Sequence, residues 1–266
     1  MQVINNTHTT QSLTKAMRWS IADKMAEERL PLVNSAVSPV KPRKGFYSTY
    51  IKRLIDIIVS LFALIVTLPV NIIIACVTLL DVGRPIFFVT ERCGKNGKIF
   101  RMIKFRNMTN ETDDKGELLP PSQRLTKCGR FIRKTSFDEL LNFWSVLKGD
   151  MSLIGPRPLP PEYLHRYNDR HKMRLCVRPG LECPQYKRLD HAHTWHEQFE
   201  NDVWYVENIS FKTDCIMLLR LFMMVFDKKT ARARGNVQRM AFMGYSEDGK
   251  ALDLSEILDD IDKEQY

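Results

Sequence analysis

The sequence predicts an α+β protein that one long apolar helix attaches to a membrane. Residues 54–80 form an apolar run of 27 residues, long enough to cross a bilayer. Further along, Asn96-Gly97 separates two apolar-bearing segments, which is the signal of a β-hairpin. Apolar residues at helical spacing then fill residues 124–148, so helices and short strands are expected to share the rest of the chain.

Composition and charge restrict the class of protein. The chain has 266 residues, 44% of them hydrophobic and 27% charged, which suits one substantial domain with appendages. The net charge is +9, although the last 21 residues carry eight acidic side chains and two lysines. A strongly basic body implies an anionic partner, either nucleic acid, anionic lipid or a phosphorylated substrate. The six cysteines are scattered without a C-x-x-C pair, so a disulfide framework and a zinc site are both disfavoured.

Residues 1–47 are a polar N-terminal extension without sustained periodicity, in which a short helix over residues 16–30 is expected. The membrane helix is expected over residues 48–82. Pro69 lies in its middle and should break or kink it, because proline removes a backbone hydrogen bond. A plain transmembrane helix is the simpler interpretation. Basic residues on both flanks favour a re-entrant helix that leaves on the side it entered: Lys41, Arg43, Lys44, Lys52 and Arg53 before it, and Arg84, Arg92, Lys95 and Lys98 after it.

Residues 83–228 are expected to form the folded core. A hairpin should occupy residues 86–108, a polar loop residues 109–123, and a buried helix residues 124–148. Four prolines in residues 152–161 predict an ordered loop without regular structure. Helical patterns resume over residues 162–175, 195–205 and 211–226, the last too short to span a membrane. Residues 229–266 form a tail that is acidic at its end, with a short amphipathic helix expected over residues 252–261.

Adjacent carboxylates at Asp138 and Glu139 are the strongest candidates for chemistry. The simpler interpretation is a capping box, in which Ser136 and Glu139 satisfy the amides of a helix start. The surroundings favour a catalytic role, because cations precede and follow the pair and the proline-rich loop comes soon after. Arginine suits bidentate contacts to phosphate, and a carboxylate nucleophile can attack phosphorus once cations neutralise the substrate. The cations are Arg130, Arg133, Lys134, Lys148 and Arg157.

Residues 48–228 resemble the bacterial sugar transferases, the monotopic polyprenyl-phosphate phosphoglycosyl transferases. After the basic-flanked helix with its proline comes K-F-R-x-M, here residues 104–108, and then R-K-x-S-x-D-E-L, here residues 133–140. Residues 146–158 match V-L-K-G-D-M-S-L-x-G-P-R-P without a gap. A P-G pair at residues 179–180 and D-x-x-Y-x-x-N at residues 202–208 follow.

The resemblance implies a fold and a reaction. The fold would be a re-entrant N-terminal membrane helix with a proline break, interfacial amphipathic helices and a small cytosolic α/β core that includes the hairpin. The chain would transfer a sugar-1-phosphate from a UDP-sugar to undecaprenyl phosphate and release UMP, on the cytoplasmic face of the bacterial inner membrane. This would be the first membrane step in assembling an exopolysaccharide, O-antigen or glycoconjugate.

The resemblance also implies roles for individual residues. Asp138 would be the nucleophile that forms an aspartyl-phosphosugar intermediate and would bind Mg²⁺, and Glu139 would assist it. The substrate phosphates would be held by Arg157, Arg133, Lys104 and Arg106. The expected partners are the UDP-sugar, polyprenyl phosphate and inner-membrane lipid, with no nucleic acid. The sequence leaves the sugar and the oligomeric state open, a homo-oligomer included.

Two features leave alternatives open. Residues 181–186 (LECPQY) depart from the L-T-G-L-A-Q-like run of many family members, in a region where nucleotide or sugar contacts are expected. This departure, with the two appended tails, permits a catalytically inactive relative that acts as a scaffold in polysaccharide assembly. His191, His193 and His196 could bind a transition metal, but no cysteine or patterned carboxylate completes the set, so a histidine-rich loop is the better interpretation.

Overall fold

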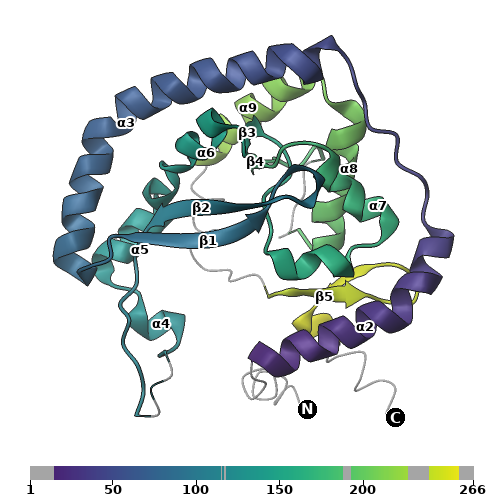
Figure 1. Cartoon of the computed structure of the whole chain (residues 1–266), viewed down its shortest axis with the longest axis horizontal. Coiled ribbons are helices and arrows are strands. Elements are labelled where there is room, and N and C mark those ends of the chain that lie inside the picture. Colours follow the sequence, from purple (N-terminus) through teal and green to yellow (C-terminus); the bar gives the residue numbers. More distant parts are fainter. Residues whose placement is uncertain (1–14, 115, 117, 188–192, 227–239, 258–266) are drawn as a thin grey trace.

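The computed structural model describes residues 15–114, 116, 118–187, 193–226 and 240–257, and it shows a mixed α+β fold (Figure 1). The strands form three two-stranded sheets: β1 (Phe87–Cys93) with β2 (Ile99–Phe105), β3 (Ser152–Ile154) with β4 (Gly180–Glu182), and β5 (Phe242–Tyr245) with β6 (Ala251–Asp253). The α-helices are α2 (Lys15–Ala36), α3 (Lys52–Val82), α4 (Pro121–Arg124), α5 (Lys127–Lys134), α6 (Asn142–Lys148), α7 (Asp169–Lys172), α8 (Trp195–Asn208) and α9 (Phe211–Phe226). Short helical turns are η1 (Tyr47–Ile51), η2 (Lys95–Gly97), η3 (Phe137–Glu139), η4 (Pro161–Arg166) and η5 (Met173–Cys176).

Helix α3, with η1 before it, is the one helix in the described part of the chain that is long and apolar enough to cross a membrane. Its polarity is the reverse of that of a helix on a water-soluble protein. Its buried residues are mainly polar and lie on one face: Lys52, Asp56, Ser60, Asn71, Ile74 and Thr78. Large apolar side chains point outward instead, and Phe62, Ile65 and Leu80 are 68%, 64% and 87% exposed. This outer face suits a lipid environment and not water.

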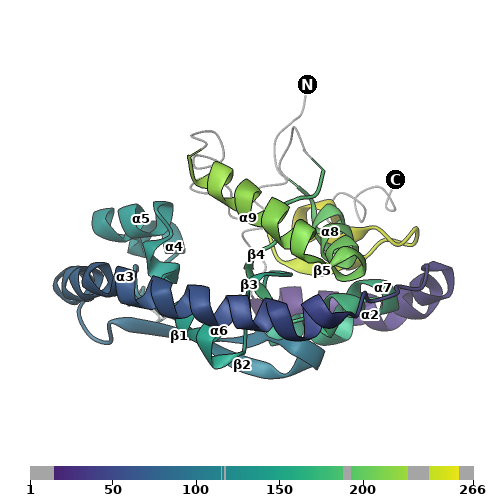
Figure 2. The ribbon, with the colours of Figure 1, turned by 90° about the horizontal axis from the view of Figure 1, so that it is seen from above.

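Both ends of α3 are tied to the same body. Near its start, Asp56 accepts hydrogen bonds from the Ser152 hydroxyl and the Leu153 amide, each at 3.0 Å. Near its end, Asp81 accepts a hydrogen bond from Thr126, and Ile74 packs in a cluster with Phe105 and Ile132. A straight helix of this length would extend over about 46 Å. In Figure 1, α3 instead follows an arc around the outside of the molecule, and Figure 2 shows this arc edge-on.

The predicted break at Pro69 does not occur as an interruption. Residues on both sides of Pro69 remain in one α-helix, and the chain changes direction through the curvature of α3 (Figure 1). Proline cannot donate to the carbonyl four residues earlier, here that of Ile65, so the helix can bend there without losing a further bond. Two residues beyond the proline, the Asn71 side chain donates to the Thr67 hydroxyl at 3.3 Å.

The predicted hairpin is confirmed. Strands β1 and β2 pair antiparallel in continuous register from Phe87 opposite Phe105 to Cys93 opposite Ile99. The turn between them places Asn96 and Gly97 at φ values of 56° and 75°, the left-handed region that asparagine and glycine tolerate best. The hairpin therefore carries Lys104 on β2 to a fixed position beside the acidic segment.

The single helix expected over residues 124–148 is wrong. Helix α5 ends at Lys134, η3 occupies three residues, and α6 begins only at Asn142. The interruption turns the acidic pair away from a regular helix surface. Residues 152–161 also differ from the expected loop, because β3 begins the segment and pairs in parallel with β4. The backbones approach so closely that a Cβ on Gly180 would lie 2.1 Å from the Gly155 nitrogen, which only glycine permits.

The two terminal segments pack on each other. Helix α2 lies along β5, and Val33 shares a buried cluster with Phe242, Tyr245 and Ala251 (Figure 1). Arg166 of η4 joins them, because its guanidinium donates to Asp23 at 2.7 and 2.9 Å. Of the helix expected over residues 252–261, residues 254–257 are helical and residues 252–253 belong to β6, while residues 258–261 lie outside the described residues.

Candidate functional site

The acidic pair lies on η3, a single turn between α5 and α6. Ser136 precedes this turn with a φ of 58°, in the left-handed region that side chains rarely adopt. Its side chain makes no capping hydrogen bond, so the capping box is wrong as an explanation for this segment. Strained backbone of this kind persists where the surrounding structure imposes it, and it concentrates at functional sites.

Glu139 lies between two cations. Its Oε1 atom accepts a hydrogen bond from Lys104 Nζ at 2.6 Å and from Arg157 Nη2 at 3.0 Å. Arg157 also donates through Nη1 to Glu182 at 3.2 Å, so it joins the acidic turn to β4. Burial alone would raise the pKa of Glu139, but the charges and hydrogen bonds of Arg157 and Lys104 outweigh it and lower the pKa to about 2. Glu139 is therefore ionised throughout the physiological range.

Asp138 differs from its neighbour in charge state and contacts. It is 7% exposed, and its Oδ2 atom accepts a hydrogen bond from the Asn107 amide at 3.3 Å. Burial raises the pKa of Asp138 to about 6, the negative charge of Glu139 adds to the rise, and Lys104 and Arg133 oppose it. Two adjacent carboxylates whose pKa values are driven apart are the arrangement found where one acts as a base or nucleophile and the other as a fixed charge.

Of the four cations predicted to bind phosphate, the structure brings three to the pair and places one elsewhere. Lys104 and Arg157 contact Glu139, and Arg133 is near enough to lower the pKa of Asp138. Arg106 is buried and donates to the Val82 carbonyl at the end of α3. Arg106 therefore secures the membrane helix to the hairpin instead of facing the carboxylates.

A cavity of about 120 Å³ lies beside Glu139, and it is lined by two polar residues to which the sequence assigns no part in the chemistry. Arg92 adds a third cation to Lys104 and Arg157, and Asn142 adds an uncharged amide. Burial and the nearby Arg157 charge lower the pKa of Arg92, although arginine remains protonated. Arg92 lies opposite Phe100 in the hairpin. This pairing depends on the strand register, which the sequence alone does not give. The cavity's other lining residues are Met102, Met151, Pro158, Leu159, Pro160 and Leu181.

Metal binding by this site would have to use substrate oxygens. The described residues contain no group of three or more histidine, cysteine or carboxylate side chains that could hold a metal ion. A Mg²⁺ ion commonly binds through one or two carboxylates together with substrate phosphates, and the Asp138–Glu139 pair fits that donor set. Glu139 Oε2 has no hydrogen-bond partner among the described residues, so one oxygen of the pair is available.

Comparison with known proteins assigns the family. The protein-family model for bacterial sugar transferases matches residues 47–228, which include the acidic pair, all three cavity cations and α3. The chain belongs to the bacterial sugar transferase family. This sugar transferase extends beyond the matched region at both ends, so α2 and the β5–β6 hairpin lie outside it.

Several relatives of this sugar transferase have undecaprenyl phosphate in their names. The chain is 45% identical over 168 residues to the uncharacterized sugar transferase EpsL of Bacillus subtilis, and this match covers 63% of the chain and 83% of EpsL. It is 33% identical over 200 residues to the undecaprenyl-phosphate galactose phosphotransferase of Salmonella typhimurium, and 40% identical over 135 residues to the UDP-glucose:undecaprenyl-phosphate glucose-1-phosphate transferase of Klebsiella pneumoniae. These matches cover 65% and 49% of this chain, but only 40% and 29% of the two longer relatives.

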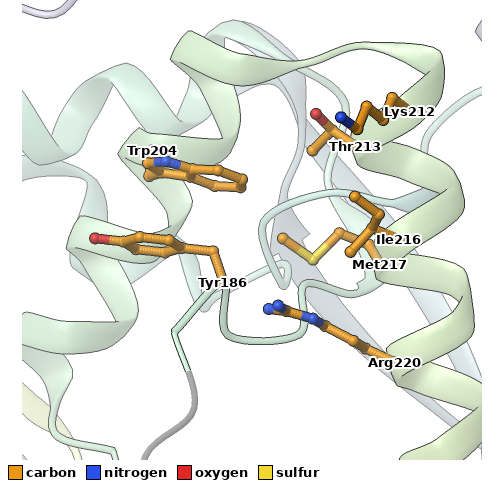
Figure 3. Close-up of a pocket in the computed structure, with 7 residues that line it drawn as sticks. All are labelled: Tyr186, Trp204, Lys212, Thr213, Ile216, Met217 and Arg220. Atoms are coloured by element: carbon orange, nitrogen blue, oxygen red, sulfur yellow. The ribbon is translucent and has the colours of Figure 1, made fainter.

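A second cavity of the sugar transferase, of about 250 Å³, lies between α8 and α9 (Figure 3) and shares no lining residue with the cavity beside Glu139. Tyr186 and Trp204 stack on one side with ring centroids 4.4 Å apart, and Met217 and Arg220 of α9 face them (Figure 3). Tyr186 ends the segment 181–186 that departs from the family pattern. The departure therefore begins at the first cavity with Leu181 and ends at the second, while Cys183 between them is buried in the core.

Proposed function

We propose that this sugar transferase moves a sugar-1-phosphate from a UDP-sugar to undecaprenyl phosphate and releases UMP, as an early membrane step of polysaccharide assembly. The names of its relatives support the substrate classes. The observation that carries the proposal is the acidic pair itself. One carboxylate is fully ionised and held by two cations, and the other is buried with a raised pKa beside it.

In the first proposed step, Asp138 is the nucleophile. Its ionised oxygen forms a bond to the phosphorus that carries the sugar, while the bond from that phosphorus to the bridging oxygen breaks and UMP leaves. In the second step, a phosphate oxygen of undecaprenyl phosphate attacks the same phosphorus and restores the Asp138 carboxylate. At pH 7 a carboxyl group with a pKa of about 6 is mostly ionised, yet it is more basic and nucleophilic than an ordinary aspartate.

Glu139 has a different role in this proposal. With a pKa of about 2 it is a weak base, so it does not suit proton transfer. Its bonds to Lys104 and Arg157 instead fix both cations in one place, where they can bind the diphosphate and stabilise charge that develops as UMP leaves. Bound Mg²⁺ would add a Lewis acid for the same phosphate oxygens, held by Asp138 and Glu139.

The proposed location is the cytoplasmic face of the inner membrane, with α3 re-entrant. Both ends of α3 are bonded to one folded body, and the outer face of the helix is apolar along its length. If α3 crossed the bilayer, its C-terminal end would lie on the far side of the membrane, where Asp81 could not contact Thr126. Helix α9 presents further exposed apolar side chains, including Phe211, Leu219 and Phe222 at 58–65% exposure, as expected of a helix at the membrane interface. The lipid acceptor would then reach the site from the bilayer.

The experiment is a measurement of UMP release by purified, detergent-solubilised protein with Mg²⁺ and undecaprenyl phosphate, across a panel of UDP-sugars. We expect release with at least one sugar, and its loss in Asp138→Asn. Asp169→Asn is a matched control, since Asp169 is exposed at the start of α7, outside η3 and the cavity beside Glu139. Silence across the panel from folded protein would overturn the proposal and favour the scaffold alternative.

A further inference from the structure

We propose that Asn142 is a specificity-determining residue that hydrogen-bonds to a hydroxyl group of the transferred sugar. This inference rests on the proposed function and extends it to the choice of donor. The structure places Asn142 in the lining of the cavity beside Glu139, whereas the sequence alone gives it no part in the chemistry.

The Asn142 side chain is buried without a partner. Asn142 is only 2% exposed, and its Oδ1 atom is shielded from solvent and accepts no hydrogen bond from the described residues. Among the described residues, its amide nitrogen also has no hydrogen-bond partner. Burying an amide without hydrogen bonds is unfavourable, and native proteins seldom tolerate it. An amide in this state at the wall of a cavity is therefore expected to pair with a group that binds there.

A structural role for Asn142 is not supported by its position. Asparagine is often found at a helix start because its side chain caps the free amides. Asn142 is the first residue within α6, but the capping position is Leu141, and no side-chain capping bond is present. Asparagine also favours exposed positions and positions where its side chain bonds to the backbone, and Asn142 is in neither.

The composition of the cavity indicates which part of the donor meets Asn142. Arg92, Lys104 and Arg157 supply charged donors, which suit the two phosphates. Asn142 is the one uncharged polar side chain that lines the cavity in the described part of the chain, and Met102, Met151 and Leu181 supply apolar surface. A sugar ring combines apolar C–H faces with hydroxyl groups. A hydroxyl both accepts and donates, so it can accept from the Asn142 amide nitrogen, and it can donate to Oδ1 once the amide group turns toward the cavity.

Asn142→Leu tests the proposal, because it keeps the branched shape of the side chain, with some added bulk, and removes both polar atoms. The full chain, wild type and variant, is assayed for UMP release with the preferred UDP-sugar and with analogues that each lack one sugar hydroxyl. We expect kcat/KM of the wild type to fall about 10-fold for one of these analogues. In the variant, kcat/KM for the parent sugar should fall by a similar factor, and the same analogue should cause no further loss.

Stability supplies a readout that activity does not. Removing an unpaired buried amide should leave the melting temperature unchanged or raise it by about 2–4 °C, while specificity is lost. If the leucine variant does not fold, Asn142→Ala removes the same amide without added bulk, and the same pattern of kcat/KM across the analogues is expected. Ser145→Ala, on the same buried side of α6 but outside the cavity, should leave the pattern of analogue rates unchanged.

The outcomes separate this inference from the function on which it rests. Coupling between Asn142 and one hydroxyl position supports the inference. A wild type that is active, with a variant whose rates fall by the same factor for every donor or whose melting temperature falls with its activity, overturns the role of Asn142 alone. A wild type that releases no UMP from any donor overturns both.

Discussion

At the scale of single residues, two neighbouring carboxylates differ because their surroundings differ. Glu139 extends toward Lys104 and Arg157, which hold it ionised. Asp138 lies in a buried environment with only an amide hydrogen bond from Asn107, and the adjacent charge raises its pKa further. The same pair on a regular helix would point to solvent, and both carboxylates would titrate near ordinary values.

The raised pKa of Asp138 predicts an acid limb in the pH profile. The nucleophile must be ionised, so kcat/KM should fall about tenfold per pH unit as the pH decreases below about 6, and should level off above it. Glu139, with a pKa of about 2, adds no second limb in this range. Rates measured from pH 4.5 to 8 at constant ionic strength test this. A profile that stays flat down to pH 4.5 would contradict the assigned charge state.

Arg157 is predicted to act through the two hydrogen bonds of its planar guanidinium, and not through its charge alone. Arg157→Lys keeps the charge, but one ammonium cannot bond to Glu139 and Glu182 in the same geometry. We expect kcat to fall about 100-fold, in line with the loss of one preorganised charge-stabilising donor. Arg170→Lys is the control, since Arg170 forms a comparable two-bond pair with Glu200 outside the site. Equal losses in both variants would show that the effect is structural.

At the scale of elements, the chain between α5 and α6 shows where sequence patterns stop being informative. Apolar spacing over residues 124–148 is helical, yet tertiary contacts break the helix at η3. Ile132 and Phe137 pack against the end of α3, and Asp138 and Glu139 turn toward the hairpin. The local signal for a capping box was present, but the left-handed backbone of Ser136 excludes that geometry.

This strain makes a prediction about stability. A left-handed conformation costs a residue with a side chain about 1–2 kcal/mol, and glycine avoids this cost. Ser136→Gly should therefore raise the free energy of unfolding by about 1 kcal/mol, whereas Ser136→Ala, which keeps a Cβ, should not. Thermal unfolding of both variants in the same detergent distinguishes them. A destabilised glycine variant would mean that the backbone at Ser136 is not strained.

Elements with purely local signals could be predicted, and those built by distant contacts could not. The apolar run, the Asn96-Gly97 turn and helix α8 each depend on residues close in sequence, and each is present. The parallel pairing of β3 with β4 joins segments about 28 residues apart through two glycines, a feature that no periodicity shows. Arg106 was placed among the phosphate ligands by its motif, but only the fold shows that it bonds to the Val82 carbonyl.

At the scale of the whole molecule, the fold separates an arc with an apolar outer face from a polar body. Helix α3 curves around one side, and the acidic site lies where β2, η3 and the loop after β3 converge beneath it (Figure 1). On the far side of that body, α2 and the β5–β6 hairpin form a joint terminal module outside the family match. The module contacts η4, which follows the loop that carries Arg157, so it can support the site without contributing a residue to it.

The terminal module has its own test. Arg166 is 1% exposed and depends on Asp23 for its counter-charge, so Asp23→Ala should destabilise the protein by about 2 kcal/mol. The KM for the UDP-sugar should stay unchanged. Lys24→Ala, which removes an exposed pair with Glu28 on the same helix, should change stability by less than about 0.5 kcal/mol. Loss of activity before any loss of stability would assign the module a direct part in catalysis.

The covalent intermediate on Asp138 is the central claim, and intact-protein mass spectrometry tests it most directly. Protein incubated with its UDP-sugar and Mg²⁺, without undecaprenyl phosphate, should gain the mass of one sugar-phosphate. Peptide mapping should place the gain on Asp138, and added undecaprenyl phosphate should remove it. Asp138→Asn should gain nothing. UMP release that strictly requires the acceptor, with no adduct at any time, would show direct transfer between the two substrates and contradict the account.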